Sequence, residues 1–168
     1  MINSHLLYGI MLWGFNTDRL SKLQKRAIRI INNAKYNAHT DPLFKNSKIL
    51  KLKDMFSLAC LKFIYKYFER SLPFHFNNIM LIEQASIHSY GTRQSQRFRL
   101  NITRTLRAQN TIRNYLPKFA NSLPECIYNK LFTHSLQGIS NYAKLLYLAE
   151  YRIECNVANC FICHRNVQ

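Results

Sequence analysis

The chain has 168 residues and a formal net charge of +16, because 24 Lys and Arg residues stand against 8 Asp and Glu residues. Hydrophobic residues make up 48% of the chain, which excludes global disorder, and the length suits one domain or one compact part of a larger protein. So basic a composition favours nucleic acid or an anionic membrane surface as the partner.

Residues 4–14 are mostly apolar and predict a short buried helix or strand that ends at Gly14. No basic region precedes the apolar run and no small-residue cleavage site follows it, so we expect no signal peptide. The run is also far shorter than the ~20 residues that a membrane-spanning helix needs. We therefore expect a nuclear or cytoplasmic protein without a membrane span.

Residues 17–33 predict a basic amphipathic helix, which is the most informative stretch of the chain. Thr17 or Asp18 can cap its first turn by accepting a backbone N–H. The apolar residues recur at steps of three and four, which predicts one buried stripe. That stripe consists of Leu20, Leu23, Ala27, Ile30 and Ile31.

Cations cover the other side of this helix. Asp18 is the only acid in the segment, so most of these cations lack an acidic partner one turn away. A row of such cations suits an external polyanion, most simply a nucleic-acid backbone. The alternative is an ordinary solvated face, although soluble helices usually mix both signs of charge. We predict nucleic-acid contacts at Arg19, Lys22, Lys25, Arg26 and Arg29.

Two further helices are expected before the middle of the chain. Asp41 and Pro42 mark a helix start, since proline is tolerated in a first turn. Residues 51–70 predict a long helix that is apolar on nearly every side and ends before Pro73, and we expect it to be the central core helix. Cys60 lies within it and is expected to act as a small buried hydrophobic residue rather than as a nucleophile.

The helical period fades between residues 84 and 124, a stretch that contains many cations and no acid. Most of these cations are Arg, whose planar fork can grip phosphate in a bidentate manner. The aromatic rings of Tyr90, Phe98 and Tyr115 lie between them in sequence and could stack on bases. The alternative is a mobile basic loop whose aromatic side chains belong to the core. We predict nucleic-acid contacts at Tyr90, Arg93, Arg97, Phe98, Arg99, Arg104 and Arg107.

The last third of the chain returns to a helical pattern. Ser122 and Pro124 predict a helix start, with Ser as the cap and Pro in the first turn, and this helix should run to about His134. A second helix is expected over residues 140–151, with Gly138 as the break between the two.

Cysteine and histidine gather near the C-terminal end in a C-x4-C-x2-C-H pattern. Thiolate and imidazole are the ligands that Zn²⁺ prefers, and C-x2-C is a usual half-site. The other half is irregular, because adjacent residues rarely both reach one tetrahedral ion, and the alternative is free thiols on a frayed terminus. Zinc is therefore a candidate, and no cofactor is required. The candidate ligands are Cys155, Cys160, Cys163 and His164.

Short sequence boxes follow one another along the chain: YGIMLWG (8–14), LQKRAIRII (23–31), HTDPLF (39–44), ILKL (49–52), HSYGTR (88–93) and NYLPKFANSLP (114–124). In this order they resemble the region just after the catalytic palm in reverse transcriptases of jockey-like non-LTR retrotransposons. The resemblance covers roughly residues 2–150. The last box departs from the family, because Phe119 and Ala120 stand near the position where the family usually has Trp.

The resemblance implies a helical thumb domain and a post-thumb segment that hold the template–primer duplex beside the palm. It implies RNA or DNA as partner, in the form of an RNA–DNA hybrid, and a palm and fingers domain that this chain lacks. The fold class is then mainly α, with a thumb-like helical bundle, a basic irregular segment and C-terminal helices. The expected units are residues 1–72, 73–121 and 122–154, followed by the Cys/His tail 155–168.

Polymerase chemistry needs clustered carboxylates that hold two magnesium ions, and the family's carboxylates include a Tyr-x-Asp-Asp-like turn. This chain has no Asp-Asp pair, and Asp18, Asp41 and Asp54 are isolated in the sequence. We therefore expect no enzyme activity from the chain alone. We interpret it as a fragment of an RNA-directed DNA polymerase that binds template and primer through its basic helix and its Arg-rich segment. The alternatives are an inert or aggregation-prone relic and a basic protein bound to a membrane surface.

Overall fold

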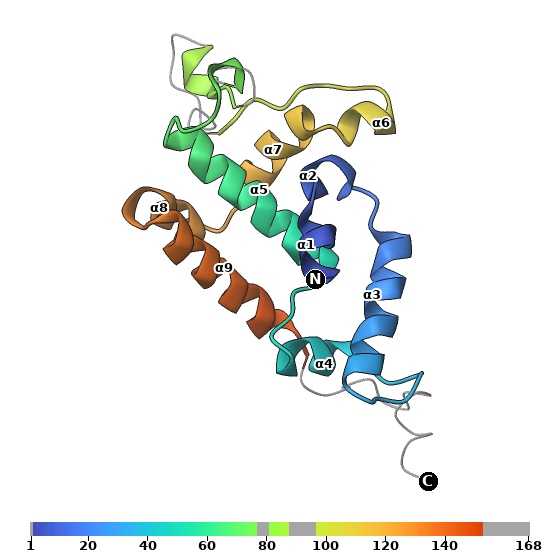
Figure 1. Ribbon diagram of the computed structural model, residues 1–168. Coiled ribbons are helices and arrows are strands. Elements are labelled where there is room, and N and C mark those ends of the chain that lie inside the picture. Colours follow the sequence, from blue (N-terminus) through green and yellow to red (C-terminus); the bar gives the residue numbers. More distant parts are fainter. Residues whose placement is uncertain (1, 77–80, 88–96, 153–168) are drawn as a thin grey trace.

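The computed structural model describes residues 2–76, 81–87 and 97–152 (Figure 1). Within these ranges the chain is mainly helical, and the β-pairing is confined to an isolated bridge between Glu83 and Phe98. This confirms the mainly α fold. The α-helices are α1 (Ile2–Leu7), α2 (Ile10–Trp13), α3 (Asp18–Ile31), α4 (Thr40–Asn46), α5 (Leu52–Phe68), α6 (Leu106–Gln109), α7 (Ile112–Asn121), α8 (Glu125–Thr133) and α9 (Leu136–Glu150), and the 3-10 helices are Phe74–Phe76 and Gln84–Ser86.

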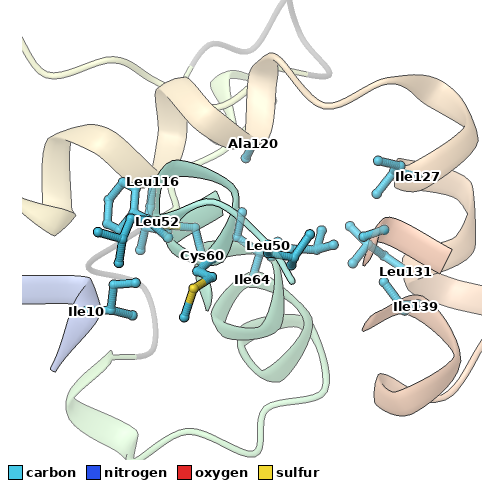
Figure 2. Close-up of a cluster of buried hydrophobic side chains, with 14 of the residues drawn as sticks. Ile10, Leu50, Leu52, Cys60, Ile64, Leu116, Ala120, Ile127, Leu131 and Ile139 are labelled. Atoms are coloured by element: carbon cyan, nitrogen blue, oxygen red, sulfur yellow. The ribbon is translucent and has the colours of Figure 1, made fainter. Parts of the chain in front are cut away.

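Helix α5 forms the centre of the molecule, as its all-round apolar sequence predicts. Helices α2, α3, α7 and α9 contact it, and Figure 2 shows side chains from α2, α5, α7, α8 and α9 in one apolar cluster. Each fully buried aliphatic side chain stabilises the fold by roughly 1.5–3 kcal/mol, so this cluster is the main source of stability. The buried residues of α5 are Leu52, Met55, Phe56, Cys60, Leu61 and Ile64.

The N-terminal apolar run forms two short helices rather than a strand. Gly9 separates α1 from α2 in the left-handed region, at φ 61°, where glycine carries no side-chain penalty. Ile10 packs into the core, but Tyr8 and Leu12 are 86% and 79% exposed. The expectation of a buried segment is therefore only partly right, because a helix as short as α2 turns a single face towards α5.

Helix α3 has the expected bounds but a different buried face. The side-chain amide of Gln24 donates to the carbonyl of Leu50 at 2.9 Å, and its oxygen accepts the N–H of Leu52 at 3.0 Å. These bonds fix the rotation of the helix, so that Ile28, about one turn further on, is the residue that is buried. The predicted stripe is therefore wrong in part: Leu23, Ile30 and Ile31 are 61%, 67% and 62% exposed. Thr17 is the N-cap residue, although its side chain makes no capping hydrogen bond.

Helix α4 begins at Thr40, with Asp41 and Pro42 in its first turn, as predicted. The stretch between residues 73 and 121, in contrast, is not irregular throughout, because it contains α6 and α7. Pro117 lies inside α7 and removes one helical hydrogen bond. Burial of Leu116, Pro117 and Ala120 on one face of this helix outweighs that loss, which local sequence rules alone do not reveal.

Two helix boundaries near the C-terminal end differ from the prediction. The Ser122 hydroxyl donates to the carbonyl of Phe119 at the end of α7, and Pro124 occupies the N-cap position of α8. Helix α9 begins at Leu136 and not after Gly138, because the Ser135 hydroxyl accepts the N–H of Gly138 at 3.3 Å and caps the first turn. The break between α8 and α9 therefore falls at residues 134–135.

Tyr151 ties the end of α9 to the start of α5. Its hydroxyl donates to the carboxylate of Asp54 and accepts the backbone N–H of Lys51 at 2.9 Å, and its carbonyl accepts from Lys45 Nζ at 3.2 Å. Lys51 Nζ also lies 4.4 Å from the centre of the Tyr151 ring and 2.9 Å from Asp41. The C-terminal helices and the N-terminal bundle consequently share one core.

The buried hydroxyl and thiol groups predict a loss of stability at alkaline pH. Burial, with a smaller contribution from the Asp54 carboxylate, raises the pKa of Tyr147 from 10.0 to about 12, and burial raises the pKa of Cys60 from 9.0 to about 12. Above pH 9 the unfolded chain releases these protons before the folded chain does, so the free energy of unfolding should fall as the pH rises from 9 towards 12. Urea denaturation at several pH values in this window checks this. A free energy that stays constant would contradict it, and Tyr147→Phe should make the fall shallower.

Candidate nucleic-acid interface

Three cations of α3 form a row on its outer surface. Arg19, Lys22 and Arg26 are all exposed, and their spacing of three and four residues places them on one face of the helix. Lys25 is exposed on the adjoining face. We call these four residues the α3 surface.

The cations of the α3 surface have no carboxylate within ion-pair distance among the residues that the structure describes. In that part of the chain the ion pair found joins Lys51 to Asp41 at 2.9 Å. Asp54 accepts the hydroxyl hydrogen bond of Tyr151, so two of the isolated aspartates have structural partners on other elements. The positive charge of the α3 surface is therefore not neutralised from within the described fold.

Arg29 differs from the other predicted cations of α3. It is partly buried, and its Nε donates to the carbonyl of Ala38 at 2.8 Å. This hydrogen bond anchors the loop between α3 and α4. Arg29 is thus partly committed to the fold, and the sequence pattern alone could not separate it from its neighbours.

The structure overturns the prediction that Phe98 stacks on bases. Its side chain is 3% exposed and packs against Phe68 at the end of α5, with 6.1 Å between ring centres. The Asn121 side chain holds the Phe98 backbone through hydrogen bonds of 2.9 Å to both its N–H and its carbonyl. Tyr115 is likewise packed against Phe15 and Phe56, at 5.3 and 5.1 Å between ring centres.

Arg97 and Arg99 are exposed because Phe98 between them points inwards. Neighbouring side chains of an extended segment alternate between two faces. The segment is held in place by hydrogen bonds from Gln84 N–H to the Arg97 carbonyl at 2.9 Å and from Arg99 N–H to the Ile82 carbonyl at 2.8 Å. Arg97 and Arg99 therefore lie on a backbone segment that is hydrogen-bonded to residues 82–84.

The predicted cations do not all meet at one place. Phe98 lies against the last residue of α5, whereas Gln24 of α3 holds the first residue, Leu52. A helix rises ~1.5 Å per residue, so these two ends are about 24 Å apart. Arg97 and Arg99 hence form a surface separate from the α3 surface.

Arg104 and Arg107 lie around α6, are exposed, and are closer to the start of α3. Helix α6 packs on α7, and Tyr115 of α7 contacts Phe15, which lies three residues before α3 begins. Figure 1 shows α3 and α6 on the same side of the view. The Thr105 hydroxyl caps α6 by accepting the N–H of Ala108 at 3.2 Å.

Several predicted residues lie outside the part of the chain that the structure describes. Tyr90 and Arg93 belong to this group, as do the candidate zinc ligands Cys155, Cys160, Cys163 and His164. Among the described residues no cluster of three or more His, Cys, Asp or Glu side chains could hold a metal ion. The zinc hypothesis consequently stays a prediction from the sequence.

Comparisons of the chain with models of protein families, with curated proteins and with solved structures give no match. In the described ranges, every helix is too short or too polar to cross a membrane. The arrangement offers exposed hydrogen-bond donors and positive charge on a packed helix, which is the chemistry that binds phosphate groups.

Proposed function

We propose that the chain binds the phosphate backbone of a template–primer duplex through the α3 surface. The observation that carries this proposal is the exposed row of Arg19, Lys22 and Arg26. Among the residues that the structure describes, no carboxylate lies within ion-pair distance of this row. Such contacts fix the position of a protein on a duplex and carry no sequence information. We therefore expect affinity for duplexes of any sequence.

The resemblance to retrotransposon reverse transcriptases supports an RNA–DNA hybrid as the duplex. In this proposal the chain is the thumb-like part of an RNA-directed DNA polymerase, and the clustered carboxylates that hold magnesium would belong to the missing palm. The chain itself then contributes binding and no catalytic step.

Exposed apolar residues near the N-terminus suit the missing palm and fingers as a second partner. Tyr8, which precedes α2, and Leu12 within α2 are largely exposed, and Leu23 and Ile30 are exposed on α3. Apolar side chains that gather on a surface mark contacts with another protein part or a tendency to aggregate. The alternative of an aggregation-prone relic would rest on the same residues, whereas the packed core around α5 supports a chain that folds by itself.

Lysine acetylation footprinting tests the proposed interface. The protein is treated with an acetylating reagent in the presence and absence of an RNA–DNA hybrid, and modified lysines are quantified by mass spectrometry. We expect the hybrid to protect Lys22 and Lys25, whereas Lys66 of α5 and Lys118 of α7, which are also exposed, should stay reactive. Equal protection at all four lysines, or protection at none, would contradict the α3 interface.

A further inference from the structure

A cleft of about 410 Å³ lies on the inner side of α3 and is open to solvent. Its walls come from α1, α3, α4, α5 and α9 and from the segment that follows α4. Leu6, Ala27, Ile31 and Leu58 contribute apolar side chains from three of these helices. The cleft is thus a predominantly apolar space that the helices leave unfilled.

Every charged residue among the described residues that line the cleft is a lysine. Lys48 follows α4, Lys62 lies on α5 and Lys144 lies on α9, and all three are exposed. A long lysine side chain can lay its methylene stem along apolar surface while its ammonium group stays near water. The cleft accordingly combines an apolar interior with positive charge at its mouth.

The size of the cleft suits a small ligand. Its volume of about 410 Å³ falls within the range of roughly 300–1,000 Å³ that is typical of small-molecule pockets. An alkyl chain has the shape and polarity that the lining requires.

We propose that this cleft binds the anion of a free fatty acid. The alkyl chain lies against the apolar lining between α1, α3 and α5, and the carboxylate is held at the mouth by Lys62 and Lys144, which stand on the contacting helices α5 and α9. The site is distinct from the α3 surface, because it uses Ala27 and Ile31 on the inner side of α3 rather than the outer row of cations.

Calorimetric titration of the whole chain with single-chain amphiphiles tests the proposal. Dodecanoate, dodecyltrimethylammonium and dodecyl maltoside share one alkyl chain and differ in the charge of the head group, and each is used below its micelle concentration. We expect one dodecanoate per chain, bound at least about tenfold more tightly than the cationic analogue. Equal affinities for the anionic and the cationic head would overturn the proposal.

Variants locate the binding. Ala27→Phe fills the cleft and should abolish saturable dodecanoate binding, with circular dichroism as the check of folding. Lys62→Gln combined with Lys144→Gln should weaken dodecanoate about tenfold and leave dodecyl maltoside unchanged. Lys66→Gln is the matched control, because Lys66 is exposed one turn further along α5 and does not line the cleft.

The cleft-filling variant and the lysine double variant test the proposal independently of each other. If Ala27→Phe does not fold, the lysine pair still gives the answer. Unchanged dodecanoate affinity in the lysine pair, or in a folded Ala27→Phe protein, would overturn the proposal. An acidic amphipathic peptide that binds the cleft more tightly than dodecanoate and displaces it would also overturn it, in favour of a protein partner.

Discussion

Replacing Arg19, Lys22 and Arg26 together by glutamine is expected to weaken the binding of an RNA–DNA hybrid by roughly two to three orders of magnitude at about 0.1 M salt. Each cation–phosphate contact releases condensed counterions and contributes about −0.9 to the slope of log K against log salt, which corresponds to about 0.9 logarithmic units of affinity at 0.1 M salt relative to 1 M. The three side chains are exposed on one face of α3, and they form no ion pair with any residue in the described ranges. Their replacement should therefore leave the fold intact. Fluorescence anisotropy with a labelled hybrid measures the change in Kd.

A matched variant separates a local interface from a general effect of charge. Lys66→Gln, Arg70→Gln and Lys118→Gln remove the same number of exposed cations from α5, from the turn that follows it and from α7. Since charges more than about 10 Å from the phosphates are largely screened at this salt concentration, the control should lose less than about tenfold in affinity. Equal losses in the two triple variants would contradict an interface centred on α3.

The Gly14→Ala variant is expected to lower the free energy of unfolding by about 2–3 kcal/mol. A Cβ atom at this position would overlap the ring of Phe56 and would lie 2.5 Å from the carbonyl oxygen of Ile10. The Phe56 ring cannot move away easily, because it packs against Phe15 at 4.9 Å and Tyr115 at 5.1 Å between ring centres. Urea denaturation followed by circular dichroism gives the difference from the unmodified chain.

Gly138→Ala provides the control for this prediction. A Cβ atom at Gly138 would meet the Ser135 hydroxyl at 3.4 Å, an ordinary van der Waals contact, and the position lies in the first turn of α9. Alanine reduces the freedom of the unfolded chain and favours the helix, so the variant should gain up to about 1 kcal/mol. If Gly14→Ala were as stable as Gly138→Ala, the packing of α2 against α5 would be incorrect.

The sequence predicts helices where one strong local pattern dominates. Helix α5 is apolar all round and α3 has both a regular period and a dense row of cations, so their existence and approximate bounds follow from the sequence. The rotation of α3 does not follow, because it depends on the hydrogen bonds between Gln24 and the start of α5. A single polar residue on the helix thus decides which apolar residues become exposed.

The candidate site, like the fold, can be predicted from the sequence only in part. The exposed cations of α3 follow from charge patterning, whereas the burial of Phe98 depends on Asn121 and Phe68, which are distant from it in sequence. The sequence does not predict α7, because Pro117 is unfavourable inside a helix. Burial in tertiary contacts compensates for this cost. The cleft on the inner side of α3 is assembled from residues of separate helices, and no local pattern marks it.

The dependence of hybrid affinity on salt concentration is the most direct measurement of the proposed function. If each of the four cations of the α3 surface neutralises one phosphate, a plot of log K against log salt for the unmodified chain should have a slope of about −3.6. The folded chain with its α3 surface predicts this slope for hybrids of unrelated sequence alike. A slope near zero, or no measurable binding by a chain that unfolds cooperatively, would contradict nucleic-acid binding through the α3 surface.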